Sequence, residues 1–177
     1  MHPILNALGF QAGWWACVLS VSRGWERPAL LLAAALALVH LRLAAQPRKE
    51  AQLALIALVL GVVVDTLLQT LGVIHFEGLA WAPLSPYWLW MLWILFALTL
   101  NASLAFLRSL PLAVSAVAGG IFGPLTYHAG AALGAATLTS TPANTIQLVL
   151  AWALAMPCLI LMARKTLTPP EERSDES

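Results

Sequence analysis

Long apolar stretches alternate with short polar segments along the whole chain. Runs such as 52–74 and 87–107 exceed the roughly 20 residues that an α-helix needs to cross about 30 Å of hydrocarbon. Because a lipid-exposed backbone must satisfy its own hydrogen bonds, and because barrel strands alternate in polarity, the pattern predicts an all-α, polytopic membrane protein. We expect one domain, residues 1–165, with six transmembrane helices at about 4–21, 28–45, 52–74, 87–107, 111–128 and 144–163.

Basic residues orient this predicted bundle. Of the nine Lys and Arg residues, only Arg23 and Arg27 fall on one side of it, and the other seven fall on the opposite side. The side richer in Lys and Arg is cytoplasmic by the positive-inside rule, so both termini are expected in the cytoplasm. The polar residues 166–177 are expected to form a disordered cytoplasmic tail.

The composition agrees with a membrane protein and narrows the range of partners. The chain is 60% hydrophobic and only 10% charged, whereas soluble domains are about 25% charged. The net charge of +1 gives no indication of a nucleic-acid partner. Cys17 and Cys158 lie inside apolar runs without metal or redox spacing, and no nucleotide-binding or hydrolase motif is present. We therefore expect no metal and no cofactor.

All eight tryptophans fall in the outer half of the predicted bundle. An aromatic belt at the membrane interface would account for this distribution. Trp14, Trp15, Trp93 and Trp152 lie deeper than a belt requires. They indicate, as an alternative, an aromatic pocket or lateral opening near the outer leaflet.

Asp65 lies about 3 Å from the middle of the third run, at 1.5 Å of rise per residue. An ionised aspartate at that depth costs about 2.5–3.5 kcal/mol on insertion scales, so its side chain is expected to face the bundle. Gly61, Gln69 and Gly72 share its helical face, and no Lys or Arg lies at comparable depth. We expect hydrogen bonds to polar neighbours, in either a functional or a purely structural role.

The same depth arithmetic assigns the other polar residues to layers. Gln69 and Tyr127 fall in the layer of Asp65, Asn6, His40 and Asn101 fall nearer the cytoplasm, and Gln11 falls near the midplane. The candidates for a substrate or proton site are Asp65, Gln69, Tyr127, Asn101 and Gln11. Secondary candidates are Asn6, His75, Glu77, His128, Trp14 and Trp93.

Two further groups have competing interpretations. His75, Glu77 and His128 could converge as an acid–base group or metal ligands at the outer surface, or be ordinary interfacial side chains. His40, near Arg42, is most simply an interfacial side chain that extends toward the head groups.

Small residues cluster in the fifth run. Gly119 and Gly123 have the four-residue spacing that lets helices approach closely, and Gly61 serves the same purpose in the third run. Pro124 predicts a break or kink at the depth of Asp65. Close helix packing around Gly119, Gly120 and Gly123 is the alternative interpretation of this segment.

Three motifs, G-x-x-x-D, W-x-x-F-A-x-T-L-N and G-G-x-x-G-P-x-x-Y, resemble those of an uncharacterised bacterial inner-membrane family, domain of unknown function 2878. The resemblance extends from about Leu5 to Met162. The matching residues are Asn6, Trp14, Gly61, Asp65, Trp93, Phe96, Ala97, Thr99, Leu100, Asn101, Gly119, Gly120, Gly123, Pro124 and Tyr127. The resemblance implies a multi-pass inner-membrane protein without a known activity. Members of this family tend to be encoded near enzymes that modify membrane fatty acids, which implies a lipid-modifying enzyme as a partner.

These features favour a protein that binds, transfers or flips a lipophilic substrate through an outward-facing aromatic and polar pocket, with membrane lipids as its partners. One alternative is a membrane-embedded lipid-modifying enzyme. Another is a non-catalytic accessory subunit of a lipid-modifying complex. The pattern favours a non-enzymatic role without deciding it, and it does not determine the oligomeric state.

Overall fold

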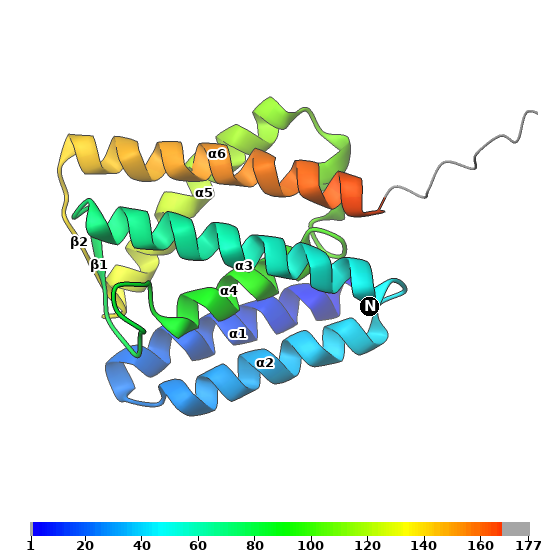
Figure 1. Cartoon of the computed structure of the whole chain (residues 1–177), viewed down its shortest axis with the longest axis horizontal. Coiled ribbons are helices and arrows are strands. Elements are labelled where there is room, and N and C mark those ends of the chain that lie inside the picture. The colour runs from blue at the N-terminus through cyan, green and yellow to red at the C-terminus, as the bar shows by residue number, and fades with distance from the viewer. Residues whose placement is uncertain (1, 168–177) are drawn as a thin grey trace, which may run out of the picture.

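The computed structural model describes residues 2–167, which form a helical bundle with two short strands (Figure 1). The elements are α1 (Pro3–Arg23), α2 (Glu26–Leu43), α3 (Pro47–Thr70), β1 (Ile74–Phe76), α4 (Tyr87–Thr99), the 3-10 helix η1 (Ala105–Ser109), α5 (Leu112–Ala132), β2 (Ala136–Leu138) and α6 (Pro142–Leu167). The predicted helical fold is confirmed, with the small sheet as an addition. Residues 166 and 167, predicted to belong to the disordered tail, are the last residues of α6, and the rest of the predicted tail lies outside the described residues.

Four helices, α1, α3, α5 and α6, are long and apolar enough to cross a membrane. In α2, three charged residues, Glu26, Arg27 and Arg42, occur within 18 residues. With 13 residues, α4 is only about 20 Å long at 1.5 Å per residue. The prediction of one continuous helix over 87–107 is therefore wrong, and the total of six spans stays a prediction.

Hydrogen bonds of side chains and of the backbone end α4 early. The Thr99 hydroxyl donates to the Phe96 carbonyl at 2.6 Å, and the Leu104 amide donates to the Thr99 carbonyl at 2.8 Å. From α1, the Asn6 amide group donates to the Leu98 carbonyl at 3.3 Å. Its oxygen accepts from the Ser103 amide and hydroxyl at 3.1 and 2.6 Å. Asn6 thus holds the turn that replaces the expected last turns of the helix.

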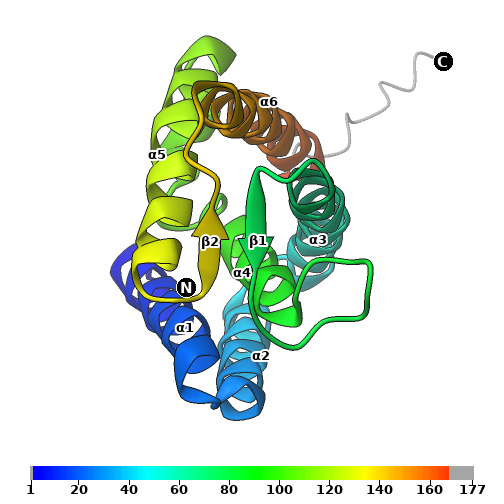
Figure 2. The ribbon, with the colours of Figure 1, turned by 90° about the vertical axis from the view of Figure 1, so that its left-hand side faces the viewer.

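Viewed along the bundle, α4 lies inside a ring formed by the other helices (Figure 2). It packs against α1, α2 and α3, whereas α6 packs against α3 and α5. The fifth helix packs mainly on α6, and α1 and α5 do not pack closely against each other. The bundle therefore consists of a four-helix group, α1 to α4, to which the α5–α6 hairpin is attached mainly through α6.

The strands β1 and β2 pair antiparallel at one end of the bundle, which we call the sheet end. Each strand follows a helix that ends at a glycine with positive φ, 69° at Gly72 and 82° at Gly134. In both cases the next amide bonds back into the last helical turn, Val73 to the Leu68 carbonyl and Ala135 to Gly130, both at 3.0 Å. These are glycine-terminated helix C-caps. The third helix consequently ends at Thr70, so Gly72 does not lie on the helical face of Asp65, contrary to the prediction.

The fifth helix continues through Pro124 without interruption, so the expected break is wrong. The packing interpretation explains why. A Cβ at Gly119 would overlap the backbone carbonyl of Trp152 in α6, and a Cβ at Gly123 would overlap the Trp152 indole, which shows how closely α5 and α6 pack. This contact stabilises α5 across the position where proline removes a hydrogen-bond donor.

Candidate functional site: an aromatic cavity beside a buried aspartate

A cavity of about 420 Å³ lies between α1, α4, α5 and α6. All five phenylalanines of the chain line it, together with Tyr127 and four of the eight tryptophans. The lining contains no charged residue. The tryptophans are Trp14, Trp88, Trp93 and Trp152. The volume is within the usual range of ligand pockets, about 300–1,000 Å³.

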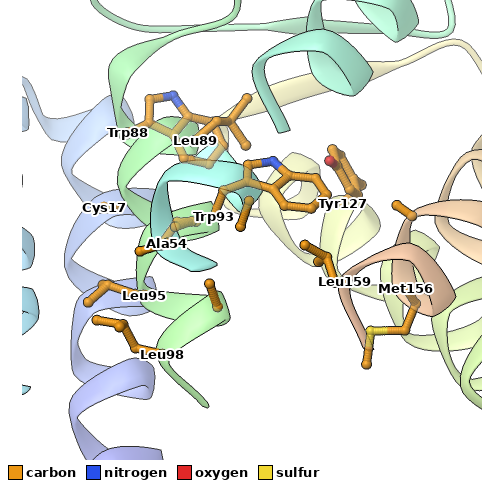
Figure 3. Packing of buried hydrophobic residues seen from close by; sticks show 14 of the residues in the cluster. Cys17, Ala54, Trp88, Leu89, Trp93, Leu95, Leu98, Tyr127, Met156 and Leu159 are labelled. Carbon is orange, nitrogen blue, oxygen red and sulfur yellow. The ribbon is translucent and has the colours of Figure 1, made fainter. Parts of the chain in front are cut away.

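Asp65 lies behind the wall of this cavity, with 0% of its surface exposed. The Trp93 indole Nε1 donates to its Oδ2 at 2.8 Å, and the Tyr127 hydroxyl donates to Oδ1. Figure 3 shows the Trp93 indole extending toward Tyr127. The carboxyl group therefore joins α3, α4 and α5 through neutral hydrogen-bond donors, the type of partner expected from the absence of a nearby Lys or Arg.

Asp65 itself is not among the residues that line the cavity, whereas Trp93 and Tyr127 are. Both of these side chains are buried, with 3% and 6% of their surfaces exposed. A molecule in the cavity would thus touch the two aromatic rings and not the carboxylate. Asp65 therefore positions the Trp93 and Tyr127 side chains, which form this part of the cavity wall.

Glycines make room for the two tryptophans at the centre of the site. A Cβ at Gly61 would overlap the Trp93 indole, and a Cβ at Gly123 would overlap the Trp152 indole. The two indoles stack with their centroids 4.9 Å apart and their planes 11° apart. Although it has no partner in hydrogen-bond geometry, the buried Trp152 Nε1 lies near enough to the Tyr127 hydroxyl to interact with it.

Asp65 and Tyr127 occupy corresponding positions in two similar units, α3–β1–α4 and α5–β2–α6. Each lies four residues after a tryptophan-accepting glycine, Gly61 or Gly123, and seven residues before the glycine of the helix C-cap. The two units meet at the Asp65–Tyr127 hydrogen bond and the Trp93–Trp152 stack. This shared spacing is visible in the sequence, but Trp93 follows Asp65 by 28 residues and Trp152 follows Tyr127 by 25, so the spacing does not extend to the two tryptophans.

The remaining primary candidates do not join Asp65. The Gln11 side chain is exposed on α1. Gln69 is half-buried and accepts from the Phe76 amide at 3.4 Å, so it supports β1. Asn101 lies beyond the end of α4, where its amide donates to Glu50 at 3.0 Å. The structure thus brings together Asp65, Tyr127 and the secondary candidates Trp93 and Trp14 around one cavity.

Asn101 belongs to a second polar cluster, at the end of the bundle opposite the sheet. The amide nitrogen of Asn6 lies 3.2 Å from His40 Nδ1, and His40 Nε2 lies 3.7 Å from Glu50. Only 4% of His40 and 8% of Glu50 are exposed. The interpretation of His40 as an interfacial side chain is therefore wrong. The sequence pattern gives no sign that Glu50 is buried, because Glu50 directly follows the polar segment AQPRK and is expected to belong to the same loop.

His75 and Glu77 form an exposed pair at the sheet end, 3.8 Å apart. The exposed His128 belongs to α5 and lines a separate small hollow beside Val73 and Leu138. Within residues 2–167 no group of three or more His, Cys, Asp or Glu side chains could hold a metal ion. The three predicted residues therefore do not form one site.

Long apolar helices and an aromatic cavity give this fold the features of an α-helical integral membrane protein. Large apolar side chains such as Leu31 and Leu154 are 73% exposed on its outer surface, as lipid contact requires. The family model described as "Protein of unknown function (DUF2878)" matches residues 3–158, and the chain belongs to this family. No curated protein and no solved structure matches the chain at a significant level.

Proposed function

We propose that this protein, embedded in the bacterial inner membrane, holds the hydrocarbon chain of a lipid in its aromatic cavity, as a step in binding, transferring or flipping that lipid. One observation carries the proposal: a cavity of about 420 Å³ with an almost wholly apolar, aromatic lining. The aromatic and aliphatic side chains of this lining offer van der Waals contacts along the length of a hydrocarbon chain.

In the proposed arrangement all six helices cross the membrane and both termini are cytoplasmic. Four helices have sufficient length and hydropathy. In the fourth span, α4 crosses the first part of the membrane and η1 crosses the remaining part. The distribution of Lys and Arg supports the orientation, which places the sheet end at the periplasmic surface.

An enzymatic role gains no support from this geometry. The buried Asp65 is separated from the cavity by Trp93 and Tyr127, and the His75–Glu77 pair does not line the cavity. A role as an accessory subunit is compatible with lipid binding. Stable co-purification with a lipid-modifying enzyme would support that role.

Gly130 offers a direct test, because it lines the cavity and a Cβ built there meets nothing within 4 Å. Gly130→Leu should therefore extend into the cavity from a position where its Cβ has room, whereas Ala132→Leu adds similar bulk at an exposed position of the same helix. Native mass spectrometry of protein purified in mild detergent should show retained lipid in the wild type and in Ala132→Leu, and at least tenfold less in Gly130→Leu. Equal lipid retention in all three proteins would contradict the proposal.

A further inference from the structure

We infer that the cavity takes one hydrocarbon chain sideways from the bilayer leaflet at the sheet end, through an opening between α1 and α5. We call this opening the side window, and its rim is formed by Trp14 on α1, Phe106 on η1, and Phe122 and Thr126 on α5. The inference rests on the proposed function. It adds the leaflet from which the hydrocarbon chain comes, the number of chains that the cavity holds, and the direction in which the chain enters.

The side window follows from the packing of the helices. The first and fifth helices both line the cavity but do not pack closely against each other. Phe106 and Phe122 line the cavity while 59% and 66% of their surfaces remain exposed. Because α1 and α5 both have membrane-crossing length, a gap between them opens onto hydrocarbon.

At the sheet end, the path from water is closed. Phe76 on β1 and Trp88 on α4 line the cavity with only 5% and 4% of their surfaces exposed. The Trp88 indole donates to the Glu77 carbonyl at 2.9 Å, which fixes it beneath the loop that follows β1. Gly134, just before β2, lies against Ser22 at the end of α1.

The opposite end of the cavity is closed by η1. Leu107 of η1 lines the cavity and is 8% exposed. Arg164 of α6 holds this segment by donating to the Arg108 carbonyl at 2.7 Å and to the Leu110 carbonyl at 2.6 Å. The side window is therefore the access route that remains.

The position of the cavity along α5 indicates one leaflet. Its lining residues on α5 extend from Ala118 to Gly130, about 18 Å at 1.5 Å per residue. Half of the roughly 30 Å hydrocarbon thickness is about 15 Å. Gly130 is only two residues from the helix end at the sheet, whereas Ala118 is six residues from the other helix end. The cavity thus matches the length of one chain in the leaflet at the sheet end.

The lining also defines what can enter. It contains no charged side chain, and its two hydroxyl groups already donate elsewhere, Tyr127 to Asp65 and Thr126 to the Phe122 carbonyl at 2.8 Å. A charged head group would have to leave water for a lining that offers no charged partner, which is costly. The chain therefore enters and the head group stays outside.

Brominated lipids test this inference, because bromine quenches only nearby tryptophans. We would use a background in which the exposed Trp15, Trp25 and Trp81 are replaced by Phe, so that most remaining tryptophans line the cavity. The protein is reconstituted in one orientation into vesicles with dibrominated phosphatidylcholine in a single leaflet. The cavity signal is the quenching that Gly130→Leu removes and Ala132→Leu retains.

The cavity signal should appear when the bromines are in the leaflet at the sheet end, and fall at least threefold when they are in the other leaflet. An equal signal, or one from the opposite leaflet only, would overturn this inference and leave lipid binding intact. The absence of a cavity signal from either leaflet would contradict the proposed function as well.

A second pair of variants tests the window without filling the cavity. Phe122→Ala removes a rim side chain, whereas Ile121→Ala removes a neighbouring side chain that is 52% exposed and does not line the cavity. Exchange of a brominated lipid into the cavity, followed by stopped-flow fluorescence, should become at least threefold faster in Phe122→Ala only. Unchanged exchange in Phe122→Ala would contradict the side window.

Discussion

Asp65 accepts hydrogen bonds from two side chains that reach it from different helices, Trp93 of α4 and Tyr127 of α5. Both donors are neutral and both line the cavity. Buried polar groups are costly when they lose their partners, so this arrangement fixes the orientation of both rings. At the residue scale, Asp65 therefore determines the shape of the cavity wall from behind it.

Asp65→Leu should lower the free energy of unfolding by about 1–3 kcal/mol, because two buried donors lose their acceptor. Asp65→Asn should cost less, since an amide can accept from Trp93 and donate to Tyr127. Adding Tyr127→Phe to Asp65→Leu should recover part of the loss by removing one unpaired donor. Thermal unfolding in detergent measures these differences.

The other tyrosine of the chain, Tyr87, provides the matched control for the double variant of Asp65→Leu and Tyr127→Phe. Tyr87 packs edge-on against Trp90 and has no hydrogen bond to Asp65. Tyr87→Phe should therefore not recover stability in the Asp65→Leu background. Recovery by both Phe substitutions would show that the Asp65–Tyr127 bond is not the cause.

Gly61→Ala should displace Trp93, because its Cβ would overlap the indole. Overpacking of this kind costs typically about 1–3 kcal/mol. Gly9→Ala is the control, since its Cβ would lie 3.9 Å from Leu36, and alanine favours a helix by up to about 1 kcal/mol over glycine. We expect a lower melting temperature and a changed tryptophan emission in Gly61→Ala only. A melting temperature that rises in both variants would contradict the close packing of the Trp93 indole against Gly61.

At the scale of single elements, α4 shows how a long apolar run can form a short helix. Hydropathy extends the run to residue 107, but the helix ends at Thr99. The difference arises from Asn6, which bonds to the Leu98 carbonyl and to the Ser103 amide and hydroxyl. The resulting turn lets η1 form the floor of the cavity.

Asn6→Ala should loosen this turn. We expect faster hydrogen exchange at the amides of residues 100–104, and a stability loss of about 1–3 kcal/mol from the unpaired groups. Gln11→Ala, which removes an exposed amide from the same helix, should change neither quantity. Unaltered exchange at residues 100–104 in Asn6→Ala would show that other contacts hold the turn.

The whole molecule combines a four-helix group with an α5–α6 hairpin, and the candidate site lies where they meet. Within it, α3–β1–α4 and α5–β2–α6 place Asp65 and Tyr127 at corresponding positions. Pairing of β1 with β2 and the Trp93–Trp152 stack join the two units. The cavity lies at the interface of these two units, lined by α4 from one and by α5 and α6 from the other.

The proposed orientation makes a prediction at this scale. A reporter fused in the loop 77–86 should behave as periplasmic, and reporters fused in 44–46 or after Leu167 as cytoplasmic, because the basic residues flank the latter positions. Paired alkaline phosphatase and fluorescent-protein fusions measure this. A periplasmic signal from 44–46 would contradict six spans with cytoplasmic termini.

The sequence by itself determined the all-helical fold class and the burial of Asp65. Both follow from local properties: the length of apolar runs, and the cost of placing a carboxylate in hydrocarbon. It also predicted that hydrogen bonds rather than an ion pair would satisfy Asp65, because no Lys or Arg lies at its depth.

The tertiary structure alone decided which polar residues meet and where the cavity forms. Gln11 and Asn101 have depths that suit a site, yet one is exposed and the other pairs with Glu50. Depth follows from position along a helix, whereas contact also requires the rotation and tilt of helices that are distant in sequence. These are set by close packing, such as the fit of Trp93 over Gly61, and no local pattern in the sequence encodes them.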